Sequence, residues 1–300
     1  MFASLAAWHR RAWAMDGRFA VALLFLPPAL FLFTLFVALP MGEAAWYSFY
    51  NWNGYGTPET FVGLKNYELL LQNRPFRIAL VNNLLIIAVS LLIQLPLALA
   101  MAVLLADRIR GAVVFRMIFF VPFVLAEIAA GLIWRFVYDG DYGLVAKTAS
   151  ALGFEPPYLL ADRELAMYAI LVVVVWKYFG FHMMLYIASL QQIDPNLYEA
   201  ARIDGATGRQ IFTQVTLPLL GPTIRLSVFF AVLGSIQLFD LIMPLTKGGP
   251  SDSTQTLVTY LYSYGVTRMR IGFGSAVGVI LFTICVVFAF GYSRIRTRYD

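Results

Sequence analysis

Six long apolar stretches recur along the chain and are separated by more polar segments. A helix needs about 20 apolar residues to cross the roughly 30 Å hydrocarbon core of a bilayer. The pattern therefore predicts six membrane-spanning helices, over residues 19–40, 78–106, 112–134, 165–190, 226–245 and 271–293. The second stretch is longer than a bilayer requires, and we expect it to tilt or to kink at Pro96. The predicted fold is an all-α integral membrane protein with a single transmembrane domain over residues 1–300.

The composition agrees with a membrane environment. Hydrophobic residues make up 60% of the chain and charged residues 13%, whereas soluble domains carry about 25% charge. An even number of spans places both termini on one side of the membrane. Lysine and arginine are denser in the short loops on the side of the termini, which predicts that both termini are cytoplasmic.

Polar residues interrupt the fourth and fifth predicted spans, and burying such groups in lipid is costly. The candidates for a solute path are Lys177, Tyr178, Phe181, Ser235, Gln237 and Asp240. Aromatic rings and polar groups together suit a sugar. Helical spacing puts Ser235 and Gln237 on different faces, and we expect Ser235 to line a cavity. Two other interpretations of Lys177 and Asp240 stay open, an ion pair between them or a position near the interface with snorkelling.

Two further polar residues in the spans have simpler expected roles. Glu127, in the third span, is expected to be paired inside the protein. His182, in the fourth span, is expected to be a satisfied packing residue. The chain has two histidines in all, so we expect no metal site.

The segment between the fourth and fifth spans, residues 191–221, is long for a simple connection. Asp194 and Pro195 are typical of a helix start, because Asp accepts from free backbone N–H groups and Pro suits the first turn. Gly205 permits a sharp turn after this helix.

A second short helix is predicted from about residue 208 to 216, ending before Pro218. The product is a compact helix–turn–helix. From the residues alone, it fits a unit that docks into a cleft of a partner and equally an amphipathic hairpin on the membrane surface.

The same segment resembles the EAA loop of permease subunits of binding-protein-dependent ABC importers. The matching positions are Glu199, Ala200, Ala201, Gly205 and the later Leu217-Pro218. Gly63-Leu64-Lys65-Asn66-Tyr67 and Thr246-Lys247-Gly248-Gly249-Pro250 resemble the sugar branch, the maltose-type permeases. The likeness extends from about Phe25 to the C-terminus and fits the shorter six-span members, since the chain lacks the extra N-terminal spans and large external loop of the larger permease.

The resemblance implies that the loop couples the permease to a cytoplasmic ATPase. The residues expected to make this coupling are Glu199, Ala200, Ala201, Asp204, Gly205 and Ala206. Glu199 is expected to make a charged contact, and Gly205 to be the hinge.

The resemblance also implies partners. The sequence has no Gly-x-x-x-x-Gly-Lys-Ser/Thr pattern for a nucleotide phosphate. We therefore expect no enzyme activity and no cofactor in this chain, with ATP and Mg²⁺ on two cytoplasmic ATPase subunits. A second homologous permease and an external solute-binding protein, periplasmic or lipid-anchored, complete the expected assembly. It would lie among the lipids of a bacterial or archaeal cytoplasmic (inner) membrane, with no role for nucleic acid.

One alternative is a secondary transporter driven by an ion gradient, which would use intramembrane carboxylates such as Glu127 and Asp240. The EAA loop argues against it, because such carriers have no use for a docking loop. A membrane-embedded enzyme is not supported, because the sequence has no His-Glu-x-x-His and no Gly-x-Ser-x-Gly motif.

Overall fold

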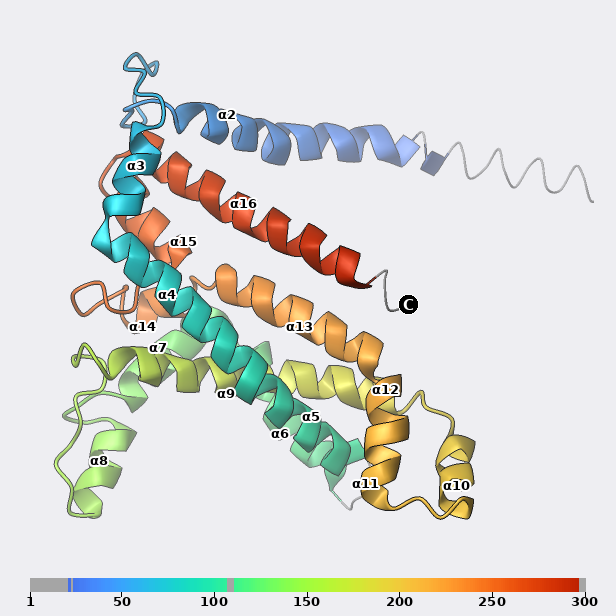
Figure 1. The fold of residues 1–300 in the computed structure, drawn as a ribbon. Helices are drawn as coiled ribbons and strands as arrows, with labels where there is room; N and C mark the ends of the chain where they lie inside the picture. Colours follow the sequence, from blue (N-terminus) through green and yellow to red (C-terminus); the bar gives the residue numbers. More distant parts are fainter. Residues whose placement is uncertain (1–20, 23, 107–110, 297–300) are drawn as a thin grey trace, which may run out of the picture.

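The computed structural model describes residues 21–22, 24–106 and 111–296 (Figure 1). Within these residues every regular element is a helix, apart from an isolated bridge between Tyr50 and Phe61. The elements are η1 (Thr34–Ala38), α2 (Leu39–Tyr47), α3 (Lys65–Gln72), α4 (Arg74–Val89), η2 (Ser90–Gln94), α5 (Leu95–Ala106), α6 (Ala112–Val124), α7 (Glu127–Val137), α8 (Leu144–Ala151), α9 (Ala166–Leu190), α10 (Pro195–Ile203), α11 (Gly208–Ile211), η3 (Phe212–Thr216), α12 (Leu217–Leu219), α13 (Gly221–Ile236), α14 (Ile242–Leu245), α15 (Leu257–Tyr260), η4 (Leu261–Val266) and α16 (Ile271–Arg296).

Four helices in the described residues are long and apolar enough to cross a membrane: Leu24–Tyr47, Arg74–Ala106, Ala166–Leu190 and Ile271–Arg294. They correspond to the first, second, fourth and sixth predicted spans. Residues 19–20 and 23 of the first predicted span lie outside the described residues, as do both termini. Two bent helix pairs bring the number of candidate spans to at most six.

The third predicted span is not one continuous helix. Its two halves, α6 and α7, meet at an angle of 100°, because Leu125 and Ala126 adopt extended backbone conformations. The bend leaves carbonyl groups at the end of α6 without helical partners. The Lys177 ammonium from α9 satisfies them, as described below.

The fifth predicted span is also interrupted. Helix α13 ends at Ile236, and α14 begins at Ile242, so a helix over 226–245 is wrong. The amide of Asn83, on α4, explains how the break is stabilised. Its nitrogen donates to the carbonyl of Ser235 at 2.7 Å, and its oxygen accepts from the backbone N–H of Leu257 at 2.8 Å. The amide nitrogen therefore replaces one bond that a continuing α13 would have made, while the oxygen ties the start of α15 to the same side chain.

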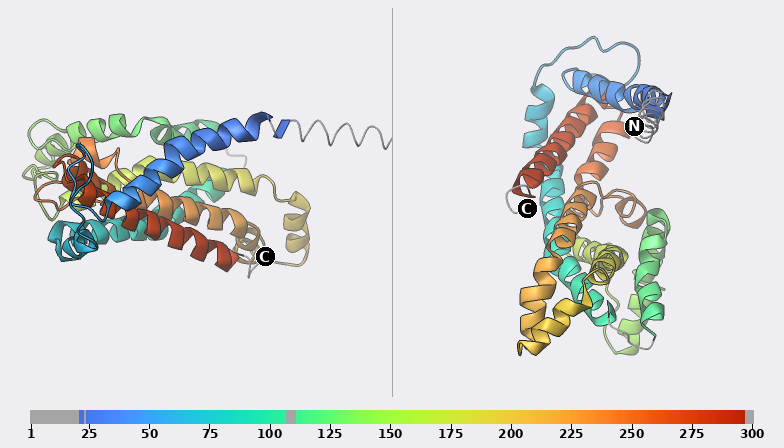
Figure 2. Two further views of the ribbon diagram at one scale, coloured as in Figure 1. Left: turned by 90° about the horizontal axis from the view of Figure 1, so that it is seen from above. Right: turned by 90° about the vertical axis from the view of Figure 1, so that its right-hand side faces the viewer.

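Helix α9 lies at the centre of the bundle, and 61% of its most apolar 18-residue stretch is buried. It packs against α5 and α6 (Figure 2). The approach to α6 is close because of Gly180, where a Cβ atom would lie 2.0 Å from the Phe119 carbonyl oxygen. By contrast, the helix Leu24–Tyr47 lies at the edge of the bundle beside α16, and none of its most apolar 18-residue stretch is buried.

Candidate functional site

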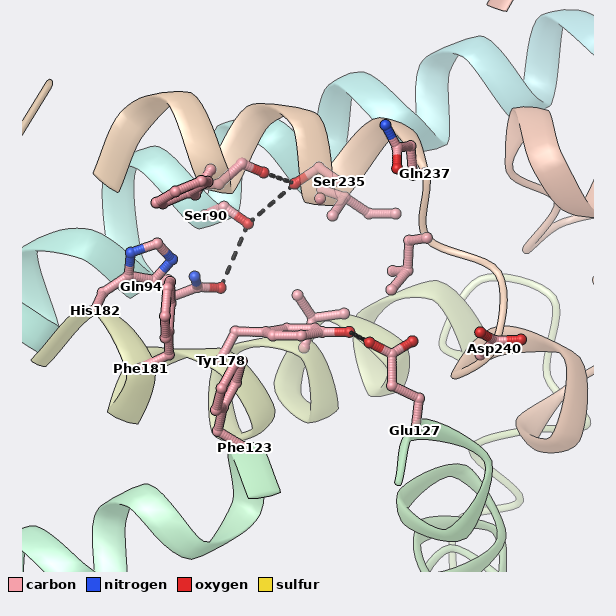
Figure 3. Close-up of a pocket in the computed structure, with 16 residues that line it drawn as sticks. Ser90, Gln94, Phe123, Glu127, Tyr178, Phe181, His182, Ser235, Gln237 and Asp240 are labelled. Atoms are coloured by element: carbon pink, nitrogen blue, oxygen red, sulfur yellow. Dashed lines mark hydrogen bonds between the residues drawn. The ribbon is translucent and has the colours of Figure 1, made fainter. Parts of the chain in front are cut away.

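A cavity of about 370 Å³ opens between η2, α9, α13 and the α6–α7 bend (Figure 3). Many of the side chains that line it are polar or aromatic. Those labelled in the figure are Ser90, Gln94, Phe123, Glu127, Tyr178, Phe181, His182, Ser235, Gln237 and Asp240. The rest of the wall is mostly apolar. Such a mixture of apolar surface and a few placed polar groups is typical of small-molecule sites.

The break after α13 brings three of the predicted residues to one cavity. Ser235 belongs to the last turn of the helix, Gln237 is its C-cap residue, and Asp240 follows in the irregular segment. The backbone N–H of Gln237 still donates to the Leu233 carbonyl at 3.1 Å. The helical spacing that separates Ser235 from Gln237 therefore holds as far as Gln237, and of the three only Asp240 lies beyond the helix. Ser235 is 5% exposed, and its hydroxyl donates to the carbonyl of Ala231 at 2.7 Å. The wall position of Ser235 agrees with the expected location, and its role in transport stays a prediction.

Glu127 is paired inside the protein, as expected. The Tyr178 hydroxyl donates to a Glu127 carboxylate oxygen at 2.7 Å, and both residues line the cavity. Phe181 stacks on Phe123, with ring centroids 4.7 Å apart and planes 22° apart. The predicted Tyr178 and Phe181 therefore present a phenol and an aromatic face to the same space.

Lys177 has a different position from the one expected for a solute contact. It does not line the cavity, and it is 2% exposed, which excludes snorkelling. Its ammonium donates to the carbonyl oxygens of Pro122, Phe123 and Leu125 at 2.8, 2.9 and 2.5 Å. An ammonium has three N–H donors, and all three are used. The proposed ion pair with Asp240 is therefore wrong, because Lys177 instead caps the C-terminal end of α6.

Two polar wall residues, Ser90 and Gln94, were not selected from the sequence, and His182 was assigned a packing role only. Ser90 and Gln94, four residues apart in η2, are each 2% exposed, with their side chains 3.4 Å apart. A pair of polar residues four positions apart in an otherwise apolar span could have indicated a wall of the cavity from the sequence. His182 packs against Phe181, but its Nδ1 is buried with no partner in the described part of the chain. The expectation that His182 is fully satisfied is therefore wrong for this atom.

The helix–turn–helix between α9 and α13 forms largely as expected. Asp194 caps α10 by accepting from the backbone N–H of Asn196 at 2.9 Å, and Pro195 opens the helix. Gly205 follows α10 with φ of +79°. The next backbone N–H, of Ala206, donates to the Ala201 carbonyl at 2.9 Å. This arrangement is a Schellman motif, which needs a residue that tolerates positive φ.

The second helix of this unit differs at its end. It begins at Gly208, after a capping box formed by Thr207 and Gln210. It continues through Pro218 to Leu219 instead of stopping before the proline. Because the π turn η3 precedes α12, Pro218 falls in the first turn of α12, where the missing N–H costs little.

The predicted coupling residues lie on a surface. Glu199, Ala200, Asp204 and Gly205 are exposed, and Ala201 and Ala206 are half-buried. A cleft of about 590 Å³ separates α10 and α11 from the ends of α5 and α9, and Glu199 and Ala206 lie on its wall. The coupling role of these residues stays a prediction.

Comparison with known proteins identifies the family. The family described as "Binding-protein-dependent transport system inner membrane component" matches residues 2–300. The chain belongs to this family. The chain is 35% identical over 262 residues to the multiple sugar-binding transport system permease protein MsmF of Streptococcus mutans. The aligned region covers 87% of this chain and 89% of MsmF. It is 32% identical over 294 residues to the diacetylchitobiose uptake system permease protein NgcF of Streptomyces coelicolor. This aligned region covers 94% of this chain and 83% of NgcF.

A solved structure supports the fold of this inner-membrane component. A chain of a bacterial ABC transporter involved in the import of the acidic polysaccharide alginate superposes with a TM-score of 0.83 and 23% identity. The superposition covers 96% of this chain and 99% of that chain. The described residues thus have the helical fold of that transporter chain, in keeping with a membrane permease family.

Proposed function

We propose that this chain is the membrane-spanning subunit of an ATP-driven ABC importer for a sugar, an oligosaccharide or a related polyol. The observation that carries the proposal is the cavity inside the bundle. Tyr178 and Phe181 supply aromatic surface, and Ser235 and Gln237 supply groups that bond hydroxyls. A sugar offers apolar ring faces and hydroxyl edges that match both kinds of group. The sugar-transport names of MsmF and NgcF support the same class.

The proposed topology has six spans: the four long helices, the bent pair α6 and α7, and α13 with the segment that follows it. Both termini then lie in the cytoplasm, as the distribution of lysine and arginine suggests. The unit formed by α10, α11, η3 and α12 lies on the same side. Its capped helices and the tight turn at Gly205 make a stiff unit that can transmit motion into α9 and α13.

The proposed partners follow from the same assembly. Two cytoplasmic ATPase subunits, with ATP and Mg²⁺, dock on the helix–turn–helix through Glu199, and a second homologous permease forms the other half of the path. An external binding protein delivers the solute. A solved alginate transporter of the same fold is in complex with a periplasmic protein bound to an alginate pentasaccharide, which supports a delivery protein of this kind.

The test is uptake by the purified assembly in proteoliposomes. We expect this chain to purify with one other permease and two ATPase subunits. Uptake should require ATP on the side of the ATPase subunits and should persist when ion gradients are collapsed. A Ser235→Trp variant should block uptake while the ATPase subunits stay bound. Uptake that follows a proton or sodium gradient without ATP would refute the proposal.

A further inference from the structure

The charged groups of the cavity wall have one sign. Glu127 and Asp240 both line it, and none of the described residues that line it is lysine or arginine. The two carboxylates and Gln237 lie toward one end of the view, whereas Gln94 and His182 lie toward the other (Figure 3). The Tyr178 hydroxyl donates to Glu127 at this end, at 2.7 Å.

The nearest buried cation does not neutralise this end by direct pairing. Lys177 lies behind the wall, with its ammonium 5.8 Å from the centroid of the Phe123 ring and 5.9 Å from that of Tyr178. Its three donors are committed to backbone carbonyls. It offsets part of the Glu127 charge through space, but it cannot donate to a solute.

The opposite end contains a buried ring nitrogen of His182 that has no hydrogen-bond partner among the described residues. His182 is 3% exposed and lines the cavity, and the unpaired atom is its Nδ1. Buried polar atoms are nearly always hydrogen-bonded. Because this nitrogen is itself buried, it offers no bond to a solute, and the charge of the cavity is set by the carboxylates at the other end.

We infer that this cavity selects solutes by charge: it takes an uncharged or positively charged glycoside and excludes anionic ones. The inference rests on the proposed function and specifies the solute class of the same site. A hydroxyl or an ammonium group donates to the Glu127 and Asp240 carboxylates, while a carboxylate or sulfonate group would meet two like charges with no cation to pair with. Like-charge juxtaposition in a partly buried site is strongly unfavourable. The acidic solute of the similarly folded alginate transporter thus does not carry over to this chain.

The experiment measures the charge preference of the cavity directly. A Gln237→Cys variant in a Cys285→Ala background places one thiol at the carboxylate end, on an exposed position. Two methanethiosulfonate reagents of similar size, one with a trimethylammonium group and one with a sulfonate group, are applied to membranes that contain the assembled transporter. Ser150→Cys in the same background, on the exposed outer surface of α8, gives the reference ratio of the two rates.

We expect the ratio of cationic to anionic labelling at position 237 to exceed the ratio at position 150 by roughly tenfold. Glu127→Gln combined with Asp240→Asn should bring the two ratios together, and glutamine still accepts from the Tyr178 hydroxyl. A thiol at 237 that reacts without charge preference, or with a preference that survives the double substitution, overturns the inference and leaves the proposed path intact. A thiol that reacts with neither reagent shows a dry site, which refutes both the inference and the proposed solute path.

Discussion

Replacing Lys177 tests the assignment of its ammonium as the cap of α6. In Lys177→Met the three carbonyl oxygens of Pro122, Phe123 and Leu125 lose their donor in a buried place. A buried acceptor without a partner costs about 1–3 kcal/mol, so three cost roughly 3–9 kcal/mol. The ammonium no longer has to be desolvated, which returns several kcal/mol. We therefore expect the free energy of unfolding to fall by about 3 kcal/mol.

The assay is reversible unfolding in mixed micelles by titration with sodium dodecyl sulfate, followed by circular dichroism. Lys147→Met is the matched control, because Lys147 is exposed on α8 and should change the free energy of unfolding by less than about 0.5 kcal/mol. Asp240→Asn separates the two possible partners of Lys177. If the ammonium bonds the carbonyls, Asp240→Asn leaves stability nearly unchanged; if it paired with Asp240, both variants would fall together. A Lys177→Met protein as stable as the control would refute the capping role.

Three further predictions concern the coupling unit and the helix contacts. Glu199→Lys and Gly205→Trp should leave the chain inserted but prevent co-purification of the ATPase subunits and abolish uptake; normal uptake in both would exclude the coupling role. Asn83→Ala removes the amide that bonds Ser235 and Leu257 and should lower the free energy of unfolding by about 2–3 kcal/mol in the same titration, so a change below about 0.5 kcal/mol would contradict the described bonds. Gly180→Ala places a methyl group against the α6 backbone and should cost about 1–3 kcal/mol; an unchanged or raised stability would show that α6 and α9 are not closely packed.

Local signals in the sequence predicted those parts of the structure that depend on neighbouring residues. A run of apolar residues is sufficient for a helix such as Ala166–Leu190, because the length alone satisfies the bilayer. Asp194 and Gly205 act on backbone groups within a few residues, so the cap and the turn of α10 were readable from the sequence.

The two helix breaks were not readable, because the groups that stabilise them come from distant parts of the chain. Lys177 lies 52–55 residues after the carbonyls that it bonds, and Asn83 lies 152 residues before Ser235. Without these partners, both regions have the pattern of continuous spans. A helical wheel applies only while the helix continues, so it did not place Asp240, which follows the end of α13.

The amide of Asn83 gives the molecule a mechanical property beyond its part in ending α13. One rigid group on α4 holds a carbonyl of the cavity wall with its nitrogen and the first turn of α15 with its oxygen. The three segments therefore move as one body unless a bond breaks. If docking of an outer protein shifts the segment before α15, the position of Ser235 shifts with it. Thermodynamic linkage is reciprocal, so a solute that favours one position of Ser235 changes the affinity of the outer face for that protein by the same factor.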